Sequence, residues 1–117
     1  MQAQLRSLWT IDGDDPRQIK PANDAFCVSL RAMIGPAGAE GEESFDFDVC
    51  SPAWLETELK SHPVVSGRFF LIIEAFDLDV IESYVRKRVA QATGADWPTI
   101  AGKLARWSRW EFEDYAG

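Results

Sequence analysis

Two alternating segments joined by a glycine-rich connection constrain the fold of this chain most strongly. Between Phe26 and Ile34 the apolar side chains fall on even-numbered positions, and between Phe45 and Val49 they fall on odd-numbered ones. Alternation with a period of two is typical of strands that bury one side and expose the other. The intervening stretch GPAGAEG has the composition of a turn. The two segments are therefore predicted to form an antiparallel hairpin.

The parity of the two segments also predicts which residues face each other across the hairpin. Inward residues are even-numbered on the first strand and odd-numbered on the second, so each pair must join an even number to an odd one. In the register that suits the length of the connection, Arg31 faces Asp46 on the outer side. The same register sets Cys27 opposite Cys50, so a cross-strand disulfide and two unlinked thiols both remain open.

Acidic side chains gather on the outer side of this hairpin. Asp46 and Asp48 alternate with the inward aromatic residues, and Glu40, Glu42 and Glu43 stand at the entrance to the second strand. The chain as a whole carries a net charge of -7. This balance disfavours binding to a nucleic acid backbone and favours a basic protein partner. The sequence therefore predicts an acidic sheet face suited to protein recognition.

Further elements are predicted on both sides of the hairpin. Gln2 to Ile11 alternates well enough for a strand with Leu5, Trp9 and Ile11 inward, although Ser7 breaks the pattern. Ser51 followed by Pro52 is a typical helix start. Three helices are expected, one from Pro52 to Lys60 and two more after the capping residues Asp77 and Asp96, with a short final strand or extended tail around Trp110 and Phe112.

The segment from Arg68 to Phe76 is apolar on both sides and is predicted to be a strand. Its odd-numbered residues are expected to face the core, which leaves Phe70, Ile72 and Glu74 on the outer face. An apolar patch beside carboxylates is typical of an interaction surface. The alternative is that another element of the same chain covers the patch. If Phe70 and Ile72 are uncovered, a homodimer is favoured.

Length and element order together predict the fold class. A chain of 117 residues is long enough to bury a core and is expected to form one domain, residues 1-117. We predict an α+β fold, with an antiparallel sheet of four to five strands and three helices packed mainly on one face. The N-terminus lacks a signal-peptide pattern, and the apolar run from Phe69 to Ile73 is too short to cross a membrane. A cytoplasmic protein without a membrane partner is therefore expected.

Catalytic constellations are weak in this sequence. Asp46 and Asp48 form a D-x-D on one strand face that could hold a divalent ion, yet no third ligand can be assigned. The single histidine, His62, lies in a loop without a recognisable partner, and the glycines match no nucleotide-binding pattern. The sequence therefore predicts a protein that is not an enzyme and that needs no metal or cofactor.

Three stretches of the chain carry a family resemblance. They are AMIGPAGAEGEESFDFDVCSPAWL (Ala32 to Leu55), RFFLIIEAFDLDVI (Arg68 to Ile81) and WSRWEFEDY (Trp107 to Tyr115). Together they resemble the bacterial immunity protein family 8, and the resemblance covers nearly the whole chain. Members of that family are small cytosolic proteins encoded beside polymorphic toxins. The resemblance implies a chain that neutralises a cognate toxin domain by binding and occluding it, and it brings no catalytic residues.

The predicted contact residues combine the acidic strand face with the apolar patch. They are Glu42, Glu43, Asp46, Asp48, Arg31, Phe70, Ile72 and Glu74. Two functions of other classes stay open beside toxin binding. One is an adaptor or structural module that uses the same surface for a cellular partner. The other is a small metal-dependent hydrolase that uses Asp46 and Asp48.

Overall fold

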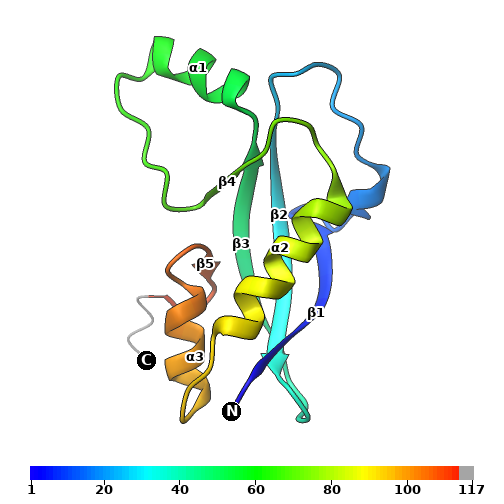
Figure 1. Cartoon of the computed structure of the whole chain (residues 1–117), viewed down its shortest axis with the longest axis vertical. Helices are drawn as coiled ribbons and strands as arrows, with labels where there is room; N and C mark the ends of the chain where they lie inside the picture. The colour runs from blue at the N-terminus through cyan, green and yellow to red at the C-terminus, as the bar shows by residue number, and fades with distance from the viewer. Residues whose placement is uncertain (114–117) are drawn as a thin grey trace.

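The computed structural model describes residues 1–113 as one five-stranded sheet with three helices (Figure 1). The strands are β1 (Ala3–Thr10), β2 (Cys27–Pro36), β3 (Glu43–Cys50), β4 (Phe70–Ile72) and β5 (Arg109–Trp110). The helices are α1 (Pro52–Ser61), α2 (Leu78–Gln91) and α3 (Trp97–Leu104), with a 3-10 turn at Pro16–Gln18. Asp114 and Tyr115, which end the family-like stretch WEFEDY, lie outside the described residues.

The central hairpin, β2 and β3, pairs in the predicted register. Arg31 is the partner of Asp46, and Cys27 is the partner of Cys50. Both thiols are free, so of the two alternatives the structure has the unlinked pair. Two glycines of the connection, Gly38 and Gly41, have φ angles of 78° and 101°, which other residues adopt only with strain. The turn chemistry and the side-chain parity therefore agree on one register.

The core lies between one face of this sheet and two of the helices. Inward residues of β2 and β3 meet the apolar stripes of α2 and α3. In Figure 1, α2 crosses the front of the sheet and α3 lies beside the lower end of β3. Fully buried side chains include Leu30, Ile34, Phe45, Phe47, Val85, Ile100 and Leu104. Most of the apolar free energy of folding comes from this layer, because each such side chain contributes about 1.5–3 kcal/mol.

The first helix stands apart from that layer. The Ser51 hydroxyl accepts a hydrogen bond from the backbone N–H of Trp54 at 3.2 Å and another from that of Phe26 at 3.1 Å, which joins the start of α1 to the residue that precedes β2. No residue of α1 is buried, and the helix lies beyond the end of the sheet in Figure 1. The Trp54 ring packs against Phe70 of β4, with 5.8 Å between centroids. Two helices, rather than all three, therefore cover the sheet face.

A bulge in β1 reverses the predicted orientation of its second half. Leu5 pairs with Ile34, but the next pair is Ser7 with Met33, so Arg6 is an extra residue in the ladder. Beyond this bulge the core-facing residues are Leu8 and Thr10. The prediction that Trp9 and Ile11 face the core is wrong, because these two residues are 43% and 42% exposed. The bulge therefore places the indole of Trp9 on the outer face of the sheet.

The last two strands both pair with the free edge of β3. The segment predicted as one strand from Arg68 to Phe76 contains the three-residue β4, which runs parallel to the end of β3. The final strand, β5, is two residues long and runs antiparallel to the start of β3. The predicted α+β class, with five strands and three helices, is confirmed. All pairings except that of β4 are antiparallel.

Candidate partner-binding surface

The registers of four strands bring one row of polar and aromatic side chains together on the outer face of the sheet. Trp9 pairs with Arg31, Arg31 with Asp46, and Asp46 with Arg109. Cross-strand partners point to the same side of a sheet, so these four residues form a continuous row, which we call the central row. Their parity places them on the side opposite α2 and α3.

An ion pair with two hydrogen bonds stands in the middle of the central row. Arg31 donates from Nε to Asp46 Oδ1 at 2.8 Å and from one terminal nitrogen to Asp46 Oδ2 at 2.9 Å. The hydrogen bonds and the charge of Asp46 raise the pKa of the Arg31 guanidinium. The guanidinium side chain is 39% exposed and the carboxylate side chain only 19%. A partner approaching the sheet therefore meets mainly the arginine.

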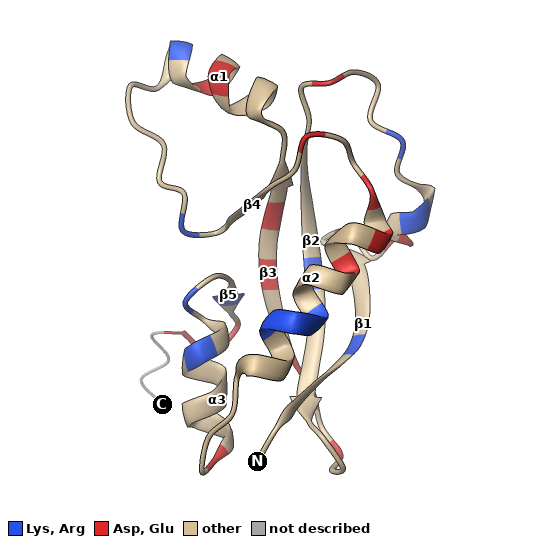
Figure 2. Cartoon of the chain, viewed as in Figure 1, with Lys and Arg blue, Asp and Glu red and all other residues tan. Residues whose placement is uncertain are grey.

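The second strand carboxylate is engaged as well. Asp48 accepts a hydrogen bond from the Ser29 hydroxyl at 2.6 Å, and its other oxygen lies 3.5 Å from a terminal nitrogen of Arg109. The Arg109 guanidinium also lies 4.4 Å from the centroid of the Phe69 ring, a cation–π contact. The outer face thus differs from the acidic face predicted from the sequence, because two guanidinium groups balance its two strand carboxylates. Figure 2 shows the acidic positions of β3 beside the basic position of β2.

Glu43 has a structural position that the sequence analysis did not anticipate. It is paired with the inward residue Ile34, and its Oε1 accepts hydrogen bonds from the indole N–H groups of Trp97 at 2.5 Å and Trp110 at 3.1 Å. Both indoles also pack against the Phe45 ring, each with 6.4 Å between centroids. Glu43 therefore joins β3 to α3 and β5 and does not belong to the outer face.

Removing the Glu43 carboxylate should destabilise the fold. Glu43→Ala leaves two partly buried indole N–H groups without an acceptor, and we expect it to lower the free energy of unfolding by about 2–3 kcal/mol. The melting temperature should fall by roughly 10 °C, measured by circular dichroism. The neighbouring exposed residue supplies the control, since Glu42→Ala should change stability by less than ~0.5 kcal/mol. Equal losses in both variants would contradict this role for Glu43.

The remaining predicted contact residues are spread around the molecule. Phe70 is aligned with Asp48 on the outer face, where Trp54 of α1 partly covers it. Ile72 is aligned with Cys50 and is 60% exposed at the edge of the sheet. Glu42 and Glu74 are exposed in the segments before β3 and after β4. The structure therefore unites Arg31, Asp46, Asp48 and Phe70 and leaves the other four apart.

The two cysteines mark the end of the outer face that α1 approaches. Cys50 is fully buried, and burial raises the pKa of its thiol. Burial, together with the nearby charge of Asp48, raises the pKa of Cys27 to about 11, and Glu58 of α1 adds to the shift. Both thiols are therefore protonated near neutral pH and poor nucleophiles.

Two residues of the central row escaped the sequence analysis. The prediction places Trp9 in the core because it assumes uninterrupted alternation along β1. The polar Ser7, which breaks the apolar pattern, is the only sign of the bulge in the sequence. Arg109 belongs to a strand of only two residues, whose pairing with β3 cannot be seen in the local pattern. Tryptophan and arginine are the residue types most enriched at the energetic centres of protein interfaces. Their presence makes the outer face a candidate for partner binding.

The carboxylates of the outer face bear on the alternative of a metal-dependent hydrolase. Within residues 1–113, no three His, Cys, Asp or Glu side chains converge so as to hold a metal ion. Asp46 and Asp48 point to Arg31, Ser29 and Arg109 instead. None of the helices in this range is long and apolar enough to span a bilayer.

Comparison with known proteins identifies the family. The family model for immunity protein 8 matches residues 3–115, nearly the whole chain. The chain belongs to the immunity protein 8 family. Neither a curated protein nor a solved structure matches it significantly. Membership of the immunity protein 8 family implies an immunity protein with a toxin protein as its partner, and it suggests a role other than catalysis.

Proposed function

We propose that this immunity protein 8 member binds a cognate toxin domain in one-to-one stoichiometry and blocks its active surface. The family match over residues 3–115 is the observation that carries the proposal. The proposed role is not catalytic. The proposed site of action is the cytoplasm, which keeps thiols such as those of Cys27 and Cys50 reduced.

The outer face of the sheet is the surface proposed to contact the toxin. The central row offers an exposed indole, Trp9, and two exposed guanidinium groups, Arg31 and Arg109, held by carboxylates beneath them. Pre-formed ion pairs of this kind fix arginines before binding, so less side-chain entropy is lost on association. Asp46 and Asp48 act in this proposal by holding the arginines, and Phe70 extends the surface toward α1.

The direct test is growth of a bacterial host that expresses the C-terminal toxin domain encoded immediately upstream, with and without this chain. Rescue of growth, together with an equimolar complex of the two purified proteins by light scattering, is the expected result. A demonstrably toxic domain that the chain neither binds nor neutralises would overturn the proposal. That outcome would favour an adaptor for another cellular protein.

A further inference from the structure

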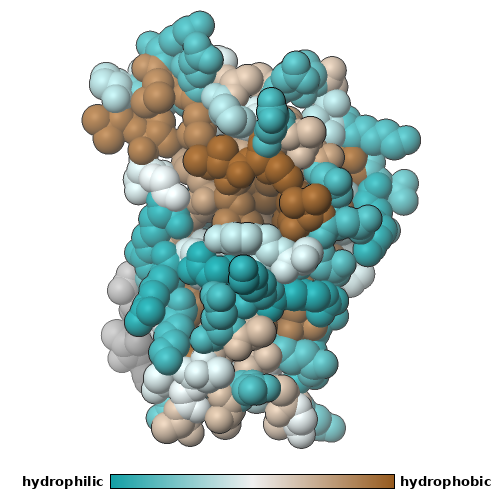
Figure 3. Space-filling model, viewed as in Figure 1, coloured by the Kyte–Doolittle hydropathy of each residue, from teal (hydrophilic) through white to brown (hydrophobic). Residues whose placement is uncertain are grey.

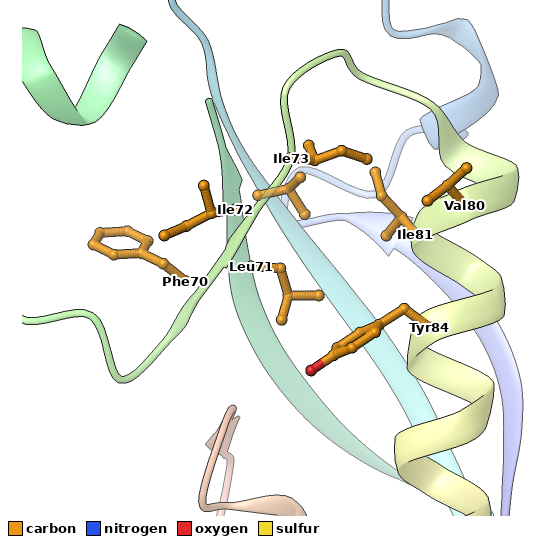
Figure 4. A pocket seen from close by; sticks show the side chains of 8 residues that line it. Phe70, Leu71, Ile72, Ile73, Val80, Ile81 and Tyr84 are labelled. Carbon is orange, nitrogen blue, oxygen red and sulfur yellow. The ribbon is translucent and has the colours of Figure 1, made fainter. Parts of the chain in front are cut away.

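An apolar surface lies on the helix side of the molecule, at the corner between β4 and the start of α2. Figure 3 shows the aliphatic part of this surface as a brown area. Three residues of the surface, Ile72, Val80 and Tyr84, are 60%, 54% and 43% exposed. They border a groove of about 320 Å³. In Figure 4 the side chain of Leu71 points from β4 toward α2, while those of Phe70 and Ile72 point away from it. The core is therefore open to solvent at this corner.

The exposed side of α2 continues this surface. Asp79, Val80, Ser83, Tyr84 and Lys87 line one shallow hollow that is mainly apolar. Asp79 and Lys87 lie four residues before and four residues after Ser83, about 6 Å along the axis on either side of it. Figure 2 shows the same order of charge, with acidic residues in the first half of α2 and basic ones in the second. Within residues 1–113, neither Asp79 nor Lys87 forms an ion pair.

We propose that a second copy of this chain packs on this surface, with the two α2 helices antiparallel about a twofold axis near Ser83. That axis sets Asp79 of each copy opposite Lys87 of the other, so two ion pairs form at once. Val80 and Tyr84 of both copies then meet between the ion pairs, and Ile72 extends the apolar contact at its edge. The contact is isologous, as in most homodimers.

Charge is what selects a second copy as the occupant. The exposed side of α2 has an acidic end at Asp79, an apolar middle and a basic end at Lys87. This pattern is complementary to that of a second copy in which the helix runs in the opposite direction. The paired arginines and the indole of the outer face lie on the other side of the sheet, so each copy in the dimer keeps its central row accessible. The dimer does not depend on the proposed toxin binding.

Sedimentation velocity over about 1–200 μM protein tests the proposal. The wild-type chain should pass from monomer to dimer, and Lys87→Glu or Asp79→Lys alone should weaken dimerisation at least ~10-fold. An equimolar mixture of the two variants should dimerise again, because each interface then joins opposite charges: Asp79 with Lys87, and the new glutamate with the new lysine. Arg106→Glu, a charge reversal in the turn after α3, is the control and should leave dimerisation unchanged.

Three results would overturn the proposal. They are a wild-type monomer at every concentration, a dimer that is insensitive to both reversals, and variants that do not recover on mixing. Thermal melts of each variant separate these outcomes from loss of fold, since reversing an exposed helix charge should cost less than ~1 kcal/mol. Tyr84→Ser, which removes apolar area without changing charge, gives a second variant that should weaken the dimer.

Discussion

Reversing the charge of Arg31 should weaken binding of the toxin domain by about 100-fold, the largest effect that we expect from a single surface change. Arg31→Glu removes a half-exposed guanidinium from the centre of the proposed contact face and leaves a glutamate beside Asp46. Trp9→Ala, at the neighbouring position of the central row, should weaken binding by at least ~10-fold. Isothermal titration of purified toxin domain gives both values.

Two controls separate binding from folding in this experiment. Like charges opposite each other on neighbouring strands are destabilising, so Arg31→Glu should also cost about 1–2 kcal/mol of stability. The exchanged pair, Arg31→Asp with Asp46→Arg, restores opposite charges between β2 and β3 while it reverses their order, and its new arginine faces Arg109 of β5. It should therefore be more stable than Arg31→Glu, less stable than the wild type, and still bind poorly. Arg106→Glu applies the same charge reversal on the helix side and should bind normally. Normal binding by all of these variants would move the contact surface away from the outer face.

The hairpin was predictable because its information is local. Alternation and parity in β2 and β3 determine the inward residues, and the glycines between them determine where the chain turns. The pair Arg31 and Asp46 followed from that register alone. The helix starts at Ser51, Asp77 and Asp96 were also predictable, since each side chain accepts a hydrogen bond from a backbone N–H just beyond it.

The rest of the candidate surface depends on contacts between distant segments. Arg109 reaches the central row because a two-residue strand pairs with β3, some sixty positions away along the chain. Glu43 shares the odd parity of the inward residues of β3, but the two indoles that donate to its oxygen, those of Trp97 and Trp110, come from two other elements. Neither composition nor periodicity predicts these contacts between distant segments. Charge counted along the chain therefore suggested an acidic face, whereas the fold pairs those acids with arginines.

Gly35→Ala should cause the largest loss of stability among small substitutions in this chain. Gly35 is buried near the end of β2, and a Cβ at this residue would lie 2.0 Å from the carbonyl oxygen of Gly41. A backbone atom cannot rotate away as a side chain can, so the end of the hairpin must open. Arg6 would resist that opening, because it donates hydrogen bonds to the carbonyl oxygens of Pro36 and Ala39 at 2.8 and 2.7 Å.

We expect the substitution to lower the free energy of unfolding by about 3 kcal/mol, with a melting temperature lower by roughly 10–15 °C. Urea unfolding followed by tryptophan fluorescence measures it. Gly67→Ala is the matched control: nothing lies within 4 Å of its added Cβ, so it should be neutral or slightly stabilising through the unfolded chain. Similar stability of the two variants would contradict this prediction, because it would mean that the fold does not need Gly35 to lie so close to the carbonyl oxygen of Gly41.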